Sequence, residues 1–222
     1  MNVVIFGANG MVGGGVLREC LEDPAIQSVL TVGRRGAGLT HPKLRELIHA
    51  DLFDLRAVAG ELAGQDACFY CLGVSSAGMS EADYRRITYD LTVAAVDVLV
   101  ESSPYIKLCF VSGQGTDSSA SGRTMWARVK GEAENYLLGL PQEAYMFRPG
   151  FIQPMKGVRS GTKIYQALYV VLGPIAPLLR RVFPGAVTTS VNVGRAMILA
   201  VTRGYPKRIL ETKDINALAE AG

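Results

Sequence analysis

Short apolar runs alternate with stretches of helical periodicity along most of this 222-residue chain. The runs have the length of buried strands, whereas the stretches between them repeat their apolar positions every three or four residues. Strands that alternate with helices are typical of βαβ units and of a parallel sheet covered on both faces. We therefore predict one domain over residues 1–222, a doubly wound parallel α/β sheet in three layers. The predicted strands are Asn2–Phe6, Ser28–Val32, Glu46–Ala50, Asp66–Leu72, Ile106–Ser112, Ala144–Arg148 and Arg208–Leu210, and the predicted helices are Met11–Glu22, Asp54–Ala63, Glu81–Glu101, Thr124–Leu138 and Val191–Val201.

The alternation stops over Phe151–Val187, a segment that holds four of the ten prolines. We expect this segment to be irregular and to lie on the substrate side of the sheet. The longest apolar run, Ala167–Leu179, is interrupted by Gly173-Pro174 and Pro177 and is too short to cross a bilayer. It lies within the mainly apolar run Tyr165–Val182. The run ends in Arg180 and Arg181, which leaves peripheral membrane contact as an alternative. Burial on the sheet or in a homodimer interface is the commoner use of such a run, and we favour it.

A glycine-rich turn follows the first predicted strand. Glycines stand at positions 7, 10 and 13, between the strand that ends at Phe6 and the helix that begins at Met11. Glycine permits unusual backbone dihedrals and close approach to a pyrophosphate, and the helix N-terminus offers free N–H groups. This placement predicts a dinucleotide-binding Rossmann fold, with an ordinary tight turn as the alternative. The residues expected to hold the dinucleotide here are Gly7, Asn9, Gly10, Met11, Val12 and Gly13.

Composition and charge exclude several classes of protein. Hydrophobic residues make up 49% of the chain and charged residues 19%, which allows a large core and excludes intrinsic disorder. The net charge of +3 is spread along the chain, so nucleic acid is not an expected partner. The chain begins without the basic segment of a signal peptide, and four cysteines do not make a disulfide framework at this length. We therefore expect a reducing, cytoplasmic setting.

Neither the cysteines nor the histidines suggest a metal site. Cys68 and Cys71 form a C-x-x-C sequence inside a predicted strand, where positions three apart point to opposite faces of the sheet. A redox or zinc site is therefore disfavoured. His41 and His49 are the only histidines and lie away from the other motifs, so we expect no histidine-based triad or metal site.

Four motifs resemble those of one known family. They are the glycine turn, with the spacing G-x-x-G-x-x-G, and the sequences Gly33-Arg34-Arg35, Val129-Lys130-Gly131-Glu132 and Arg148-Pro149-Gly150. The chain from Asn2 to about Ala200 resembles the atypical and extended short-chain dehydrogenase/reductases, which include the NAD-dependent epimerase/dehydratases. Within that group it is most similar to the small Tat-interacting-protein-like oxidoreductases. The resemblance implies a bound NAD(P) cofactor, a small-molecule substrate and an oxidoreductase or epimerase-like activity.

Arg34 and Arg35 follow the second predicted strand, where this fold contacts the adenosine ribose. No acidic residue occurs between Asp23 and Glu46 to accept the ribose hydroxyls of NAD, whereas guanidinium groups suit the phosphate of NADP. We therefore expect NADP rather than NAD, with a pair of solvated loop charges as the alternative. By resemblance to the family, further contacts to the adenosine half come from Asp51, Leu52, Leu72, Gly73 and Val74.

The resemblance places the chemistry after the fifth and sixth predicted strands. Family members have a serine that binds the substrate carbonyl and a Tyr-x-x-x-Lys motif on the next helix, whose lysine holds the ribose and lowers the tyrosine pKa. Ser112 and Lys130 occupy the serine and lysine positions, but Trp126 stands in place of the tyrosine. Indole does not ionise near neutral pH, so Trp126 can position a carbonyl but cannot act as acid or base. Pro149 and Gly150 are expected beside the nicotinamide.

Two classes of function fit these residues. The first is an NADP-dependent oxidoreductase or epimerase-like enzyme that acts on a small, largely apolar carbonyl compound. The second is a regulator or assembly factor that holds NADPH without turnover, for which the missing tyrosine is no handicap. An enzyme would need another proton donor, and the tyrosines that could replace the missing one are Tyr84, Tyr89, Tyr136 and Tyr165.

Overall fold

The computed structural model describes residues 1–155 and 185–222, and within them the chain forms one main sheet of seven strands. The strands of this sheet are β1 (Asn2–Phe6), β2 (Ser28–Gly33), β3 (Leu44–Ile48), β4 (Ala67–Tyr70), β5 (Lys107–Val111), β6 (Ala144–Arg148) and β9 (Ile209–Glu211). Their order is β3-β2-β1-β4-β5-β6-β9, and all neighbours are parallel. The chain therefore builds from β1 to one edge and then crosses to the other half, which confirms the predicted doubly wound sheet.

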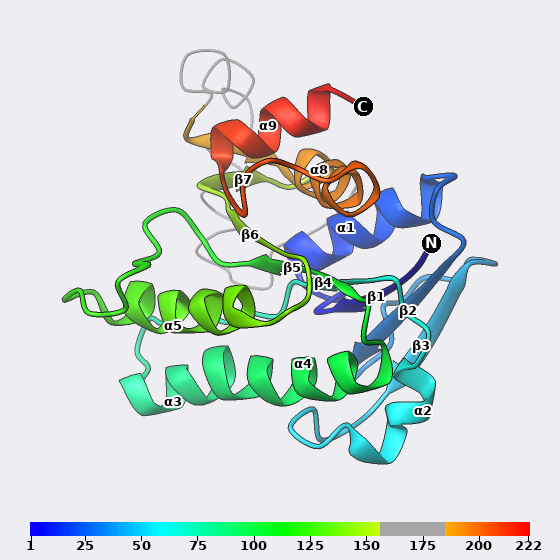
Figure 1. Cartoon of the computed structure of the whole chain (residues 1–222), viewed down its shortest axis with the longest axis horizontal. Helices are drawn as coiled ribbons and strands as arrows, with labels where there is room; N and C mark the ends of the chain where they lie inside the picture. Colours follow the sequence, from blue (N-terminus) through cyan, green and yellow to red (C-terminus); the bar gives the residue numbers. More distant parts are fainter. Residues whose placement is uncertain (156–184) are drawn as a thin grey trace.

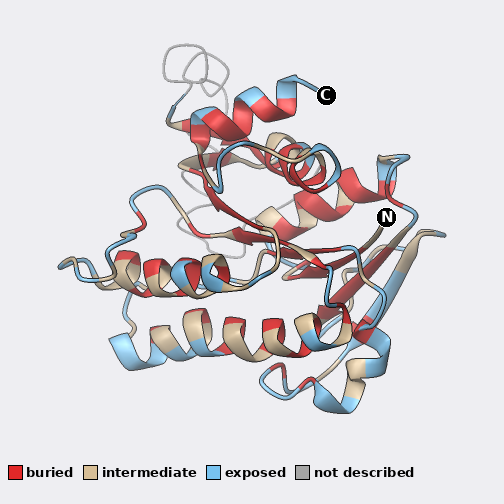
Figure 2. Cartoon of the chain, viewed as in Figure 1, coloured by how far each residue is buried: buried red, intermediate tan, exposed pale blue. Residues whose placement is uncertain are grey.

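Helices cover both faces of the sheet (Figure 1). The helical segments are α1 (Met11–Glu22), a 3₁₀ turn (Arg56–Val58), α2 (Ala59–Leu62), α3 (Glu81–Arg85), a π-helical turn (Arg86–Asp90), α4 (Leu91–Ser102), α5 (Met125–Gly139), α8 (Ser190–Arg203) and α9 (Thr212–Glu220). Side chains of β1 alternate between two apolar clusters: Val3 and Ile5 pack with α1 and α8, whereas Val4 and Phe6 pack with α4 and α5. Buried residues accordingly line both sides of the sheet in Figure 2, and the three-layer prediction is confirmed.

Two predicted helices differ from the observed ones. The helix predicted over Glu81–Glu101 is interrupted by the π-helical turn between α3 and α4. One wide turn leaves the apolar periodicity on either side nearly unchanged, so the sequence did not reveal it. The helix predicted over Asp54–Ala63 is only a 3₁₀ turn followed by α2. Here the Asp54 carboxylate accepts the Arg56 backbone N–H at 3.2 Å, a local bond that competes with helix formation.

The prediction for the third strand is displaced by two residues. The strand was expected over Glu46–Ala50 and lies at Leu44–Ile48. It is an edge strand in which Leu47 alone is fully buried, so its alternation of apolar and polar positions is weak.

The expectation of an irregular segment over Phe151–Val187 is wrong at both ends. Strands β7 (Phe151–Gln153) and β8 (Val187–Thr189) pair in parallel as a small second sheet, with Phe151 opposite Val187. Three-residue strands are too short for an alternating pattern to identify them. The apolar run Tyr165–Val182 lies outside the described residues. In the described part of the chain, no helix is long and apolar enough to cross a membrane.

The last helix, α9, was not predicted although the sequence carries a signal for it. The side chains of Glu211 and Asp214 form a reciprocal capping box with the backbone at its start. Its buried residues, such as Ile215 and Leu218, then pack on α8.

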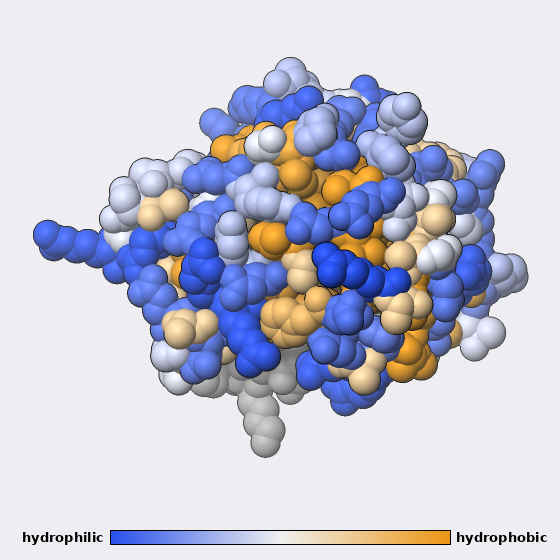
Figure 3. Space-filling model, turned by 60° about the horizontal axis from the view of Figure 1, so that its bottom comes forward, coloured by the Kyte–Doolittle hydropathy of each residue, from blue (hydrophilic) through white to orange (hydrophobic). Residues whose placement is uncertain are grey.

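One face of the molecule combines apolar and polar surface. Figure 3 turns forward the side that carries α3 and α4, and apolar side chains lie there among charged ones. Tyr89, Val100 and Tyr136 are partly buried apolar residues packed against the core of this side. The homodimer remains a prediction.

Candidate functional site

The glycine turn joins β1 to α1 with close backbone contacts. Gly7 has a φ of +83°, and its carbonyl accepts the backbone N–H of Gly10 at 2.9 Å. A Cβ at Gly13 would lie 2.2 Å from the Gly7 carbonyl oxygen, so only glycine fits where the helix leaves the turn. Gly10 is the N-cap of α1, and no side chain caps this end of the helix. The first N–H groups of α1 are therefore available to an anion.

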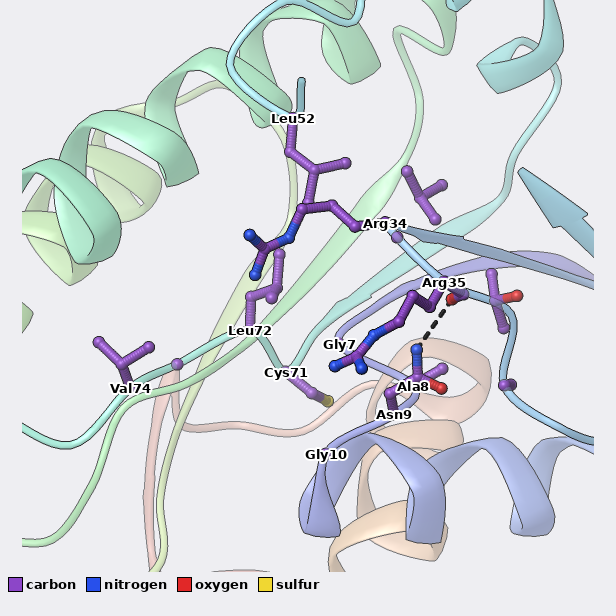
Figure 4. A pocket seen from close by; sticks show the side chains of 15 residues that line it. Gly7, Ala8, Asn9, Gly10, Arg34, Arg35, Leu52, Cys71, Leu72 and Val74 are labelled. Atoms are coloured by element: carbon purple, nitrogen blue, oxygen red, sulfur yellow. Dashed lines mark hydrogen bonds between the residues drawn. The ribbon is translucent and has the colours of Figure 1, made fainter. Parts of the chain in front are cut away.

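A cavity of about 300 Å³ opens beside this turn, where the sheet reverses its strand order (Figure 4). We call it the glycine-turn cavity. The Asn9 side-chain amide donates to the Arg35 carbonyl at 2.8 Å and ties the turn to the loop after β2. In Figure 4 the Arg34 guanidinium points toward Leu52 and Leu72, whereas that of Arg35 points toward the glycine turn. Its lining residues are Gly7, Ala8, Asn9, Gly10, Thr31, Val32, Gly33, Arg34, Arg35, Ala37, Leu52, Cys71, Leu72, Gly73 and Val74.

A second cavity, of about 510 Å³, lies at the carboxyl ends of β5 and β6. We call it the Lys130 cavity. It brings together Lys130, Trp126, Pro149 and Gly150, which the sequence placed in the reaction site. Val74 lines both cavities, so they adjoin. The remaining lining residues are Ser75, Ser76, Tyr84, Gly113, Gln114 and Phe151.

Close packing of α5 on the loop after β5 positions Lys130. A Cβ at Gly131 would lie 1.8 Å from the Asp117 carbonyl oxygen, so glycine next to the lysine lets the helix approach this loop. The Asp117 backbone N–H donates to the Ala127 carbonyl at 3.0 Å. The partly buried Lys130 donates from Nζ to the Ser112 carbonyl. Burial lowers the pKa of Lys130 to about 8, although the nearby Glu134 carboxylate raises it.

A buried ion pair lies behind the Lys130 cavity. Arg148 Nε lies 3.0 and 3.1 Å from the carboxylate oxygens of Glu134, whose side chain is fully buried. Arg148 also donates to the Ser118 hydroxyl at 2.7 Å. Glu134 raises the pKa of Arg148, which keeps the pair charged. This pair joins α5 to β6 and to the loop after β5.

The Ser112 hydroxyl lies in this buried network. It donates to Glu134 Oε1 at 2.5 Å and lies 3.2 Å from the Phe147 carbonyl oxygen. Its side chain is not among those that line the Lys130 cavity. The predicted contact between Ser112 and a substrate carbonyl therefore has no support from this arrangement. Ser112 instead helps to position Lys130, because its backbone carbonyl accepts a hydrogen bond from the lysine Nζ.

Of the residues predicted to contact the adenosine half of the cofactor, some line the glycine-turn cavity and one does not. Leu52, Leu72, Gly73 and Val74 line the glycine-turn cavity. Asp51 does not, and its carboxylate accepts the Phe53 backbone N–H at 2.9 Å. The predicted contact between the Asp51 carboxylate and the adenine ring therefore has no support from this arrangement.

Two residues of the Lys130 cavity were missed or left open by the sequence. Gln114 is not among the predicted site residues. It lies exposed in the loop after β5, where no periodic pattern or motif indicates a function. Tyr84 was one of several tyrosines, and only the fold shows that α3 brings it to this cavity.

The C-x-x-C sequence does not form a site. Cys68 belongs to the apolar cluster on the α4 side of the sheet, and Cys71 packs against the cluster on the α1 side, as predicted from strand geometry. Both thiols are unbonded, and burial raises the pKa of Cys71 to about 12. Among the described residues, no group of His, Cys, Asp and Glu side chains could hold a metal ion.

Comparison with solved structures identifies the fold. A dTDP-glucose 4,6-dehydratase from Streptomyces venezuelae, solved with NAD and DAU bound, superimposes with a TM-score of 0.69 at 17% identity and covers 100% of this chain and 80% of its own. A short-chain dehydrogenase family protein from Francisella tularensis gives a TM-score of 0.64 at 12% identity over 91% of both chains. The chain has the short-chain dehydrogenase/reductase fold. The resemblance drawn from the four motifs is thus confirmed.

Two curated relatives match about two thirds of this chain. Protein fmp52-2 of Aspergillus oryzae is 28% identical over 67% of this chain, and protein HTATIP2 of Rattus norvegicus is 26% identical over 68%. These matches span 66% and 62% of the relatives' own lengths. No family model matches the chain. The match to HTATIP2 agrees with the predicted similarity to Tat-interacting-protein-like oxidoreductases.

The expectation of a cytoplasmic setting is contradicted by these relatives. The Aspergillus oryzae protein is named mitochondrial, as are FMP52 proteins of Candida albicans and Eremothecium gossypii. Composition and the first residues of the chain carry too little information to distinguish the cytoplasm from mitochondria. The prediction of a cytoplasmic setting therefore had no positive evidence.

Proposed function

We propose that this protein is an NADP(H)-dependent oxidoreductase that reduces a small, largely apolar carbonyl compound. The observation that carries the proposal is the shared edge of the two cavities at Val74. A dinucleotide held at the glycine turn can extend from there toward Lys130 and Trp126. When bound, NADPH supplies a hydride. The chain's own residues must bind and orient the carbonyl compound and supply the proton that its oxygen takes up.

The glycine-turn cavity fits a dinucleotide phosphate. The uncapped N-terminus of α1 offers N–H groups and a positive dipole end, and the turn has no side chains at Gly7 and Gly10 to obstruct them. Arg35 points toward this turn, and Arg34 points toward the apolar side chains of Leu52 and Leu72. None of the described residues that line this cavity is acidic, which favours a ribose phosphate over free ribose hydroxyls.

The Lys130 cavity suits an apolar substrate with one polar group. Tyr84, Trp126 and Phe151 contribute aromatic walls, which bind flat apolar molecules well. Gln114 and Trp126 carry N–H donors, and Lys130 carries the only positive charge among the described lining residues. A carbonyl oxygen is the acceptor that such donors would orient.

A second candidate function is a regulator that holds NADPH without turnover. Two observations favour it: Trp126 replaces the family's tyrosine, and the Ser112 hydroxyl is buried against Glu134. Cofactor binding is common to both candidates, so binding alone does not distinguish them.

Calorimetry and a turnover assay test the proposal together. We expect NADPH to bind more tightly than NADH, and NADPH to be oxidised in the presence of an aldehyde, ketone or quinone. Tight NADPH binding without oxidation by any acceptor would support the regulator instead. Equal affinities for NADPH and NADH would contradict the cofactor assignment, and failure to bind either nucleotide would overturn the proposal.

A further inference from the structure

The Lys130 cavity holds few groups that can release a proton. Among its described lining residues, Tyr84 and Lys130 are the ones whose side chains titrate in water below pH 12. The hydroxyls of Ser75 and Ser76 are much weaker acids. Within the described lining of this cavity, a carbonyl that accepts a hydride could take its proton from Tyr84, from Lys130 or from water. Tyr165, another of the tyrosines considered as a donor, lies outside the described residues.

Tyr84 is poorly suited to this role. Its side chain is 1% exposed, and burial raises the pKa of its hydroxyl above the usual value of about 10. A phenol of raised pKa is a weak proton donor at neutral pH, and catalytic efficiency falls as the donor pKa moves away from the working pH. Tyr84 is better explained as part of the apolar wall.

Lys130 has protons to give. An ammonium group has three N–H bonds, and the described hydrogen bonds of Lys130 use one of them, toward the Ser112 carbonyl. The carboxylate of Glu134, one helical turn away, is held by Arg148 and by the Ser112 hydroxyl. Within the described part of the chain, two N–H groups of Lys130 are therefore without a protein acceptor and available to a ligand in the cavity.

We propose that Lys130 is the proton donor of this site and acts directly on the substrate, in the place of the tyrosine that Trp126 replaces. The inference rests on the proposed function. A bound reduced nicotinamide would supply the hydride: a C–H bond of the nicotinamide breaks and the ring is oxidised, while a C–H bond forms at the carbonyl carbon and the carbonyl is reduced. An N–H bond of Lys130 breaks as its proton passes to the carbonyl oxygen. The resulting amine regains a proton from water.

The electrostatic surroundings of Lys130 agree with this role. Among the described residues, the Glu134 carboxylate on α5 acts on Lys130 electrostatically, Arg148 on β6 is paired with that carboxylate, and Tyr84 on α3 lines the same cavity. Burial outweighs the attraction of Glu134 and brings the pKa of Lys130 to about 8. The ammonium is thus mostly present at pH 7 and is a stronger acid than an exposed lysine. Aldehyde reduction should proceed fully below pH 8 and decline as the pH rises above it.

The test compares Lys130→Arg with the unmodified protein on two acceptors. Arginine keeps the positive charge but does not release a proton at any working pH. Hydride addition to benzaldehyde yields an alkoxide, which is about as strong a base as hydroxide and therefore needs a proton donor. Hydride addition to 1,4-naphthoquinone yields a phenolate, whose conjugate acid has a pKa of about 10 and needs little help.

We expect Lys130→Arg to reduce kcat for benzaldehyde by about a hundredfold or more, because a positioned acid contributes that much. Naphthoquinone reduction should fall by less than about tenfold, the difference between the two acceptors being set by the acid strengths above. Because Lys130 is also expected to hold the ribose, both acceptors are compared at saturating NADPH, so that a change in NADPH affinity affects neither kcat. An equal fall with both acceptors would show that the lysine only binds cofactor, and no fall with benzaldehyde would mean that another group donates. Either result overturns the inference and leaves the proposed function standing. NADPH binding with no oxidation by either acceptor would overturn both.

A direct titration tests Lys130 without any turnover. The protein is labelled with ¹³C-lysine, and the Lys130 signal, assigned by its loss in Lys130→Arg, is followed by NMR against pH in the nucleotide-free protein. We expect its pKa near 8. A midpoint near the ordinary value of about 10.4 would overturn the inference, whether or not the variant is active.

Discussion

In the function proposed above, the backbone of the glycine-turn cavity would do most of the cofactor binding, whereas side chains of the Lys130 cavity would do the chemistry. The first keeps its motif glycines, its uncapped helix and its arginine pair. The second is lined by Lys130, Trp126, Pro149 and Gly150. The difference teaches that the two proposed sites can vary independently, because one depends on the backbone of the glycine turn and the other on side chains from α3, α5 and the loops after β5 and β6.

The largest effect is expected from the ion pair behind the Lys130 cavity. Arg148→Met should lower the free energy of unfolding by about 3–5 kcal/mol, because it leaves the buried Glu134 carboxylate without its counter-charge. Denaturant unfolding measures the change. Arg128→Met is the matched control: its partner Glu81 is half exposed, and such pairs contribute about 0–1 kcal/mol. Comparable losses in the two variants would show that the buried pair does not support this cavity.

The arginine pair should have a smaller effect, confined to the glycine-turn cavity. Arg34→Ala and Arg35→Ala should each weaken NADPH binding tenfold or more, because a charge-assisted contact contributes about 1.5–3 kcal/mol. NADH affinity should change little in calorimetry. Arg45→Ala, at an exposed position of β3 outside the cavity, provides the control. If both variants weakened NADH and NADPH equally, the arginines would not recognise the ribose phosphate.

The smallest effect should come from restoring the family's tyrosine. Trp126→Tyr should raise benzaldehyde reduction by about tenfold, less than the hundredfold of a first acid, because Lys130 already donates a proton. NADPH affinity should stay nearly unchanged. A variant no faster than the unmodified protein would mean that a phenol at this position does not reach the carbonyl.

The sequence was sufficient for most of the fold and for the position of the glycine turn. The positions of glycine after β1 fix the turn and the start of α1, since a Cβ at Gly13 would meet the backbone of Gly7. The layers followed from the alternation of strand and helix. The strands β7 and β8 were missed because three residues carry no periodicity.

At the Lys130 cavity, the directions in which the side chains point could not be predicted from the spacing of residues in the sequence. Ser112 stands at the expected place after β5, yet its hydroxyl turns to Glu134. That preference arises from Arg148, which is distant in sequence and brings the carboxylate there. Tyr84 reaches the cavity only because the chain after β4 places α3 near the carboxyl ends of β5 and β6. Such contacts are set by tertiary packing and had to be read from the structure.

The fluorescence of Trp126, the only tryptophan of the chain, tests most directly whether the two cavities form one cofactor site. A nicotinamide that extends from the glycine turn to the Lys130 cavity lies beside the indole, and reduced nicotinamide absorbs where indole emits. Titration with NADPH should strongly quench the tryptophan emission and produce sensitised nicotinamide emission, whereas NADP should quench without this transfer. Tryptophan emission that stays unchanged with saturating NADPH, its occupancy confirmed by calorimetry, would contradict the account.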